Sequence, residues 1–267
     1  SRVLYPNDSG PSGKALRLKQ QYFFSSASLQ DLVRAYVSRF GTDFGKFAEL
    51  HVIQLNDTHP VVAIPELMRI LMDEYNVGWD DAWNVVTHTF AYTNHTILAE
   101  ALEKWPIEIF QGLLPRVYQI VEEINRRLLI SLREKYPNDF ERHQKLSIIN
   151  NGHVFMAWLA IHSCFSVNGV AALHSEILRT KELKDWADLY PAKFNNKTNG
   201  ITQRRWLLNA NPSLAKFITA RIGGGWEKDL TKLKALERFS NDEASLAELT
   251  AIKRSNKQRL AEYLKHT

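Results

Sequence analysis

Cysteine is nearly absent from this sequence, since Cys164 is the one cysteine among 267 residues. A single cysteine excludes an internal disulfide and fits the reducing cytoplasm, which is the location we expect. Long apolar runs are also missing: the most hydrophobic window, residues 154–165, has 12 residues, whereas a membrane-spanning helix needs about 20. The first ten residues lack the charged and apolar regions of a signal peptide. We therefore expect a globular protein without a membrane partner, in which residues 154–165 form a buried helix.

A strong excess of one charge is absent as well. The 34 basic and 29 acidic residues leave a net charge of +5. Basic side chains are mixed with acidic ones along predicted helices, as on a solvated surface, so we expect no nucleic-acid partner. A basic helical nucleic-acid binder stays open as an alternative, which salt-dependent binding would reveal. The hydrophobic content of 45% and charged content of 24% indicate a globular domain with a buried core.

The common short catalytic motifs are missing too. Residues 10–15, GPSGKA, have two residues between the glycines where a phosphate-binding loop has four, and Ala15 replaces the serine or threonine that binds magnesium. The sequence contains no H-E-x-x-H, C-x-x-C or G-x-S-x-G. His88 and His95 could share a helix face, but two histidines without a third ligand are typical of packing or surface positions. We expect no metal site.

Helical spacing of apolar residues dominates what is present, and strands are few. We predict an α/β protein that is predominantly helical, with one short buried strand at residues 51–55. Residues 1–20 are predicted to be loop, residues 136–153 a loop with a short turn or strand, and residues 181–205 irregular. The predicted helices lie at residues 29–40, 61–71, 79–90, 114–135 and 156–180, the last interrupted near Asn168-Gly169, with further helix after residue 205 broken at residues 223–225.

Polar residues follow the predicted strand where a helix is expected to begin, in Asn56-Asp57-Thr58-His59-Pro60. A structural interpretation makes Asp57 or Thr58 the N-cap of the next helix, with Pro60 or Pro65 in its first turn. That interpretation does not require Asn56 and His59. In α/β sheets, ligands bind in the crevice at the carboxyl ends of the strands. The junction therefore also predicts a site for a sugar or a phosphate, and both interpretations remain open.

Two further polar clusters have the same character. One is Ala91 to Thr96, AYTNHT, and the other is Asn195 to Thr202, followed by Arg204-Arg205-Trp206. Amide, carboxylate and imidazole groups make directional bonds to hydroxyls, while aromatic rings pack on sugar faces. The clusters thus suit a carbohydrate, although the Asn/Gly-rich one also fits a simple turn. Residues 195–200 are the best candidate for a domain boundary.

Nine motifs in the same order along the chain carry a family resemblance. They are RVLYPND (2–8), LRLKQQYFF (16–24), IQLNDTHP (53–60), IPELMRIL (64–71), AYTNHT (91–96), EALEKWP (100–106), LLPR (113–116), VNGVAALHSEIL (167–178) and KFNNKTNGITQRRWL (193–207). The chain resembles the glycogen, starch and maltodextrin (α-glucan) phosphorylases over nearly its whole length.

The resemblance implies a bilobal α/β enzyme of the two-Rossmann-domain glycosyltransferase (GT-B) architecture. Such enzymes cleave the terminal α-1,4-linked glucose of a glucan with inorganic phosphate, release glucose 1-phosphate and are usually homodimers. They bind pyridoxal phosphate through a lysine that follows Gly-Thr-Gly-Asn-Met. Here Met68, Met72 and Met156 are followed by Arg, Asp and Ala, so we expect no cofactor-binding residue and no bound cofactor in this chain.

The resemblance also assigns candidate site residues. His95 corresponds to the catalytic histidine that lies against the glucosyl unit, with its side chain on the sugar 6-hydroxyl. Asn199 would share that hydroxyl. Asp57 and His59 would line the cleft on the acceptor-sugar side. Asn7 and Asp8 match a mobile gate loop over the active site.

The sequence departs from the family pattern at three places. Residues 9–12 replace the usual gate sequence and so bear on the gate contacts, whereas Gln203 and Ala99 replace two usual prolines that do not touch the chemistry directly. We expect residues 1–199 to be the later part of the N-terminal lobe, with half of the catalytic cleft, and residues 200–267 to be the first helices of the C-terminal lobe. An isolated piece of this extent is expected to be inactive. The alternative is a glucan-binding portion without catalysis.

Overall fold

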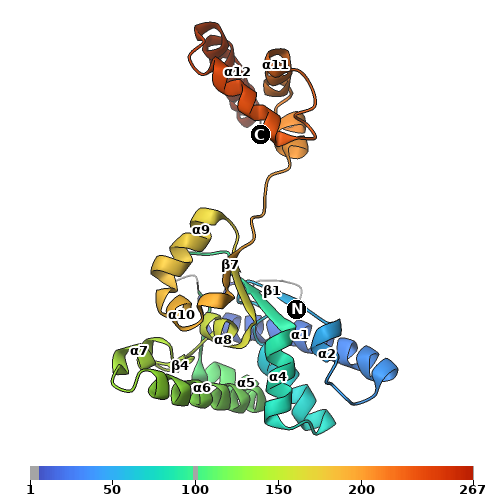
Figure 1. Cartoon of the computed structure of the whole chain (residues 1–267), viewed down its shortest axis with the longest axis vertical. Coiled ribbons are helices and arrows are strands. Elements are labelled where there is room, and N and C mark those ends of the chain that lie inside the picture. The colour runs from blue at the N-terminus through green and yellow to red at the C-terminus, as the bar shows by residue number, and fades with distance from the viewer. Residues whose placement is uncertain (1–5, 99–101, 267) are drawn as a thin grey trace. The chain divides into compact units, whose positions relative to one another are not determined.

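The computed structural model describes residues 6–98 and 102–266 (Figure 1). The chain divides into two compact units, Ser1–Thr198 and Asn199–Thr267. The first unit contains two small sheets surrounded by helices, and the second is helical. Ala99, where the sequence differs from a usual proline of the family, lies outside the described residues, as do parts of the motifs at residues 2–8 and 100–106.

The larger sheet has four parallel strands in the order β1-β2-β6-β7. Helices between the strands make parallel pairing possible. One row of side chains across the sheet is buried: the register partners Leu55, Tyr92 and Val167 are at most 1% exposed. The predicted α/β class is therefore confirmed. The strands are β1 (Ile53–Asn56), β2 (Phe90–Thr93), β6 (Ser166–Gly169) and β7 (Phe194–Asn196).

A smaller antiparallel sheet lies elsewhere in the first unit, in the order β3-β5-β4. Its strands are β3 (Lys104–Pro106), β4 (Ile149–Asn150) and β5 (His153–Phe155). Asn151 and Gly152 join β4 to β5 with φ of 47° and 72°. Positive φ at both central residues matches the twist of a hairpin, and Asn-Gly is the dipeptide that tolerates it best. Residues 136–153 were predicted to be a loop with a short turn or strand. The strand is present as β4, and a helix at Phe140–Lys145 precedes it.

The first helix, α1 (Pro11–Phe40), begins much earlier than predicted. The prediction of a loop through residue 20 was wrong, because Pro11 occupies the first helical turn, where a missing N–H costs nothing. Gly13 is needed in that turn for another reason: a Cβ there would lie 1.9 Å from the carbonyl oxygen of Asn7. Gly41, with φ of 74°, ends the helix as predicted.

The other helices of the first unit largely follow the predicted apolar spacing. On α6, buried residues recur every three or four positions along one face. The described helices of the first unit after α1 are α2 (Phe47–Leu50), α3 (Ala63–Arg69) with a π-helical continuation at Ile70–Glu74, α4 (Trp79–Thr89), α5 (Ile107–Leu113), α6 (Pro115–Lys135), α7 (Phe140–Lys145), α8 (Met156–Ser163), α9 (Ala172–Ile177) with a π-helical continuation at Leu178–Glu182, α10 (Lys184–Leu189) and a 3₁₀ turn at Pro191–Lys193.

Two predictions in this region were wrong. Residues 156–180 do not form one interrupted helix, because strand β6 replaces the predicted interruption and separates α8 from α9. Residues 181–205 are not irregular, because they contain α10 and β7. A short buried strand and a short buried helix have the same apolar content, so periodicity does not distinguish them.

The second unit is helical around a small core of its own. Trp226 is fully buried there against Ala215, Phe217 and Ile218, and its indole N–H donates to Thr219 Oγ1 at 3.1 Å. The predicted break at residues 223–225 is present, with positive φ at its first and last glycine. The elements of the second unit are a π-helical segment at Arg204–Asn209, α11 (Pro212–Ile222), a 3₁₀ segment at Leu230–Phe239 and α12 (Glu243–His266). Nowhere in the described chain is a helix both long and apolar enough to cross a membrane.

Candidate functional site

Parallel pairing brings the polar clusters of the first unit to one edge of the larger sheet. Because all four strands run the same way, the segments that follow them leave at the same carboxyl edge. Backbone bonds continue the ladder past the strand ends: Asp57 N–H donates to Thr93, Asn94 N–H to Asn168 and Lys197 N–H to Gly169, at 2.9–3.1 Å. Polar segments from all four strands therefore lie at the edge of the sheet where the sequence predicted a ligand crevice.

His95 lies in the loop that leaves β2 and is exposed. The residue before it explains this placement. Asn94 is fully buried, donates to the Tyr92 hydroxyl at 3.1 Å and accepts from the Thr96 N–H at 3.0 Å. Burial in turn raises the pKa of Tyr92, so its hydroxyl stays neutral. A buried anchor followed by an exposed imidazole presents His95 at the carboxyl edge.

Sequence reasoning missed a polar bridge between the strands beneath these loops. Asn168, 5% exposed, accepts from Thr93 Oγ1 at 3.0 Å and from Gln54 Nε2 at 3.4 Å. Gln54 Nε2 also donates to Thr93 Oγ1 at 2.7 Å. The available signal was the presence of polar side chains within all three strands, whose sequences are IQLN, FAYT and SVNG. The bridge fixes the ends of β1, β2 and β6 relative to one another.

Asp57 comes directly after β1 with φ of 65°, a left-handed conformation that aspartate tolerates better than most residues. Its Oδ1 accepts from the N–H of Thr58 at 2.7 Å. The predicted N-cap role of Asp57 or Thr58 was wrong, because α3 begins at Ala63 without a side-chain cap and a turn intervenes. Pro65 does lie in the first turn of α3, as expected.

His59 belongs to an ionic cluster that joins α1 to the β1 loop. Its Nδ1 lies 3.4 Å from Glu103 Oε2 and 3.4 Å from Arg17 Nη2, and Arg17 also pairs with Glu103 at 3.3 Å and with Asp8 at 2.9 Å. The hydrogen bond to Glu103 raises the pKa of His59, against the opposing effect of partial burial. The structure thus links the predicted residues Asp8 and His59 through Arg17, which sequence reasoning did not select.

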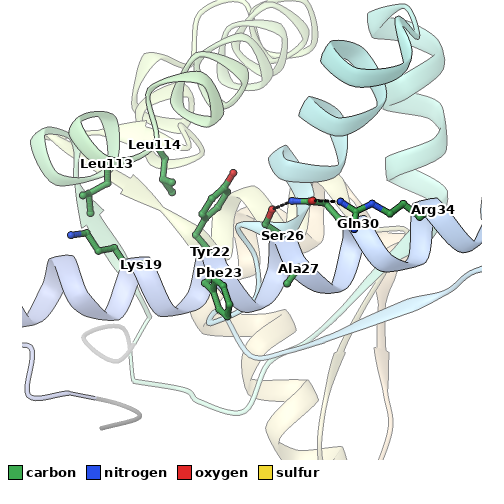
Figure 2. A pocket seen from close by; sticks show the side chains of 9 residues that line it. All are labelled: Lys19, Tyr22, Phe23, Ser26, Ala27, Gln30, Arg34, Leu113 and Leu114. Carbon is green, nitrogen blue, oxygen red and sulfur yellow. Dashed lines mark hydrogen bonds between the residues drawn. The ribbon is translucent and has the colours of Figure 1, made fainter. Parts of the chain in front are cut away.

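A cavity of ≈ 290 Å³ opens beside this cluster. Arg17, Asn56 and His59 line it, so it contains residues of the carboxyl edge. A larger cavity of ≈ 660 Å³ lies along α1 (Figure 2). Tyr22, Phe23 and Leu114 give it apolar walls, and it contains none of the predicted site residues. The smaller cavity is therefore the one that belongs to the candidate site.

Asn7 and Asp8 precede α1. The exposed Asn7 accepts the N–H of Ser9 through its Oδ1 at 3.0 Å. Asp8 is tied to Arg17 by the ion pair described above, with 47% of its side chain exposed. Within the described parts of the chain, no group of three or more His, Cys, Asp or Glu residues is arranged to hold a metal ion.

Comparison with known proteins identifies the family. A family model described as carbohydrate phosphorylase matches residues 1–267. The chain belongs to the carbohydrate phosphorylase family. It is 49% identical to a glycogen phosphorylase of Bacillus subtilis over 264 residues, 49% identical to the human muscle form over 274 and 48% identical to a Synechocystis glycogen phosphorylase over 270. The predicted resemblance is confirmed.

These phosphorylases are much longer than the chain. The alignments cover 99–100% of this chain but 32–33% of each relative, so it spans about a third of their length. The family has the GT-B glycosyltransferase fold, and the parallel sheet with helices described above agrees with that architecture.

Asn199 belongs to a different compact unit from the other predicted site residues. It is exposed and belongs to the second unit, next to Gly200 with φ of 64°, whereas His95, Asp57, His59, Asn7 and Asp8 belong to the first. Five of the six predicted residues therefore belong to the first unit, where Asp57, His59 and His95 follow its strands and Asp8 reaches His59 through Arg17.

Lys193 shows how this chain relates to the cofactor that the family implies. Burial lowers the pKa of Lys193 to about 8. Its Nζ donates to the carbonyls of Ile161 at 3.0 Å and His162 at 2.7 Å, at the end of α8, and lies 4.3 Å from the centre of the Tyr190 ring. These contacts commit it to capping a helix. Lys193 does not fit the role of a lysine that forms an imine with pyridoxal phosphate.

Proposed function

We propose that this chain is part of an α-glucan phosphorylase. The whole enzyme would cleave terminal α-1,4-linked glucose with inorganic phosphate and give glucose 1-phosphate. The observation that carries the proposal is the exposed imidazole of His95, anchored through buried Asn94 at the carboxyl edge of the sheet in a carbohydrate phosphorylase. Glycogen phosphorylases of about half-identical sequence support the choice of substrate.

Each predicted residue has a proposed task. His95 would bond the sugar 6-hydroxyl, and its backbone carbonyl would face the positive charge that develops at the anomeric carbon, which preorganised dipoles stabilise. Asn199 would share the 6-hydroxyl. Asp57 and His59 would face the acceptor sugar. Asn7 and Asp8 would form the gate, with the ion pair between Asp8 and Arg17 holding it in the arrangement seen here.

The division of the chain supports a proposal for its place in the enzyme. Residues 1–199 would be the later part of the N-terminal lobe and residues 200–267 the start of the C-terminal lobe, a boundary one residue after the one between the two compact units. Pyridoxal phosphate would be held by a lysine outside this chain and would supply proton transfer to the attacking phosphate. The 267-residue chain would then be inactive alone. We further propose that the whole enzyme is a homodimer and that it is cytoplasmic. The free, buried thiol of Cys164 fits a reducing compartment.

A second candidate function is glucan binding without chemistry. It is favoured by the polar carboxyl edge, which this chain forms from its own strands without any cofactor. Retention of the chain on immobilised glycogen would support this function, and loss of retention on adding soluble maltoheptaose would show that the binding is specific.

Phosphorolysis of maltoheptaose tests the main proposal. With added pyridoxal phosphate, we expect release of glucose 1-phosphate by the whole enzyme of which this chain is proposed to be a part, called the longer protein below. We expect none by the 267-residue chain. In the longer protein, His95→Ala should lower kcat/KM about 10²-fold, the usual effect of removing one preorganised polar contact at a reacting centre. His88→Ala, an exposed histidine on α4, is the matched control and should change nothing. Activity of the 267-residue chain alone would refute the proposed division.

A further inference from the structure

His174 on α9 contacts the backbone of two loops at the carboxyl edge. Its Nδ1 accepts the N–H of Val170 at 3.0 Å, directly after β6. Its Nε2 lies 3.5 Å from the carbonyl oxygen of Thr96, the residue after His95 in the loop from β2. One imidazole therefore connects the loop that carries His95 to the loop after β6.

These two contacts require one form of the ring. A backbone N–H can only donate, so Nδ1 must be unprotonated to accept from Val170. The ring proton then lies on Nε2, where it can donate to the Thr96 carbonyl, which can only accept. The neutral tautomer with hydrogen on Nε2 satisfies both loops at once, and no other form does.

Gly169 and Ser175 show that this arrangement is built into the chain. A Cβ on Gly169 would lie 2.9 Å from His174 Nδ1 and 2.5 Å from Ser175 Oγ, so a larger residue would displace both side chains. Ser175 Oγ donates to Asn196 Oδ1 at 2.8 Å, at the end of β7. Helix α9 packs against β6 and β7 (Figure 1). The adjacent pair His174 and Ser175 thus reaches the segments that follow β2 and β6 and the last residue of β7.

The contacts of His174 are not those of a core residue. None of the six residues of α9 is buried, so this short helix adds little apolar surface to the core. His174 itself is partly exposed. Its polar contacts to the two loops are therefore the main consequence of having histidine at this position, and its substitution should leave the fold of the unit intact.

We propose that His174 is a positioning residue that fixes the location of His95. As the neutral tautomer it ties Thr96 to Val170, and so it holds the loop that presents His95 against the end of β6. The proposal rests on the proposed role of His95 in the reaction. It assigns His174 no contact with substrate: the residue acts through the backbone on either side of the site.

Two substitutions separate the two contacts. In His174→Asn, the amide oxygen takes the place of Nδ1 and still accepts from Val170, but nothing reaches Thr96. In His174→Gln, the longer amide reaches the place of Nε2 and still donates to Thr96, but Val170 loses its acceptor. In the 267-residue chain labelled with [¹⁵N]valine, we expect exchange of the Val170 amide to be about tenfold faster in the Gln variant and unchanged in the Asn variant.

The second measurement is phosphorolysis by the longer protein. Each variant removes one of the two contacts, so both should lower kcat about tenfold while KM for maltoheptaose stays within about twofold, because a misplaced group lowers the rate of the bound complex. His88→Gln on the surface of α4 is the control and should leave kcat unchanged. The melting temperature of every variant should stay at the wild-type value.

Either measurement can overturn the proposal. Equal exchange of Val170 in the wild type and the Gln variant would show that the bond to Nδ1 does not hold the loop. Unchanged kcat in both variants would show that the contacts do not position His95. Absence of phosphorolysis in the unsubstituted longer protein would instead refute the proposed function, and the exchange comparison would still decide whether His174 holds Val170.

Discussion

At the scale of single residues, His59 has one ring nitrogen facing two different partners. Arg17 can donate only to an unprotonated Nδ1, whereas Glu103 can accept only from a protonated one, and both lie 3.4 Å away. The raised pKa of His59 means that the contact with Glu103 prevails. Arg17 pairs with Glu103 as well, at 3.3 Å, so Arg17 and His59 face the same carboxylate.

A substitution at Glu103 tests this balance. Glu103→Gln should lower the pKa of His59, because it removes the carboxylate that favours the charged ring and leaves Arg17, which opposes it. An NMR titration of His59 measures the change. Glu108→Gln, an exposed glutamate in the first turn of α5, is the control. An unchanged His59 pKa in Glu103→Gln would mean that Glu103 is not its partner.

The sign of the stability effect follows from linkage. The pKa of His59 is higher in the folded state than its usual value of about 6.5, so the stabilisation is fully present below that pH. It is lost as pH rises through the folded-state pKa. Urea unfolding below and above this window should therefore show a loss of stability with rising pH that is smaller in Glu103→Gln.

Sequence reasoning worked unevenly at this scale. Asp57 and His59 were selected from one short polar segment, and both lie at the carboxyl edge as the strand-to-helix junction predicted. Arg17 and Glu103, which hold His59, are 86 positions apart in the chain and meet only after folding. No local pattern marks such a pair, because its members belong to different elements.

At the scale of elements, two glycines with similar open surroundings should respond oppositely to alanine. Gly152 has φ of 72° in the β4–β5 hairpin, whereas Gly112 lies within α5, and a Cβ at either position meets nothing within 4 Å. Gly152→Ala should destabilise by about 1–2 kcal/mol because of the left-handed backbone. Gly112→Ala should stabilise by about 0.5–1 kcal/mol because alanine loses less backbone entropy in a helix. Urea unfolding of both variants measures the difference, and equal effects would contradict it.

Long amphipathic helices were predictable, and short buried elements were not. The spacing on α6 and α4 repeats over several turns, so the pattern is unambiguous. Strands β6 and β7 have four and three residues, which are too few for a periodic spacing of apolar residues to be recognised in the sequence. Their identity is decided by pairing with β2 and with each other, which the local sequence does not report.

At the scale of the whole molecule, the two compact units should unfold separately. Residues 197–202 are exposed and without regular secondary structure, so trypsin should cleave the native chain after Lys197. Trp226→Ala should destabilise the second unit by about 3–5 kcal/mol, because its core centres on that ring. Calorimetry should then show one transition shifted and the other, from the first unit, unchanged. A single shared transition would mean that the units are coupled.

The sequence alone determined the family and the α/β class, because ordered motifs and helical periodicity are local properties of the chain, and it predicted six residues for the candidate site. Tertiary structure decided how those residues meet. Parallel pairing of β1, β2, β6 and β7 gathered separate polar segments at one edge, and burial of Asn94 turned His95 outward. It also placed His174 between two loops 74 residues apart. Such long-range contacts depend on pairing register and packing, which no local segment encodes.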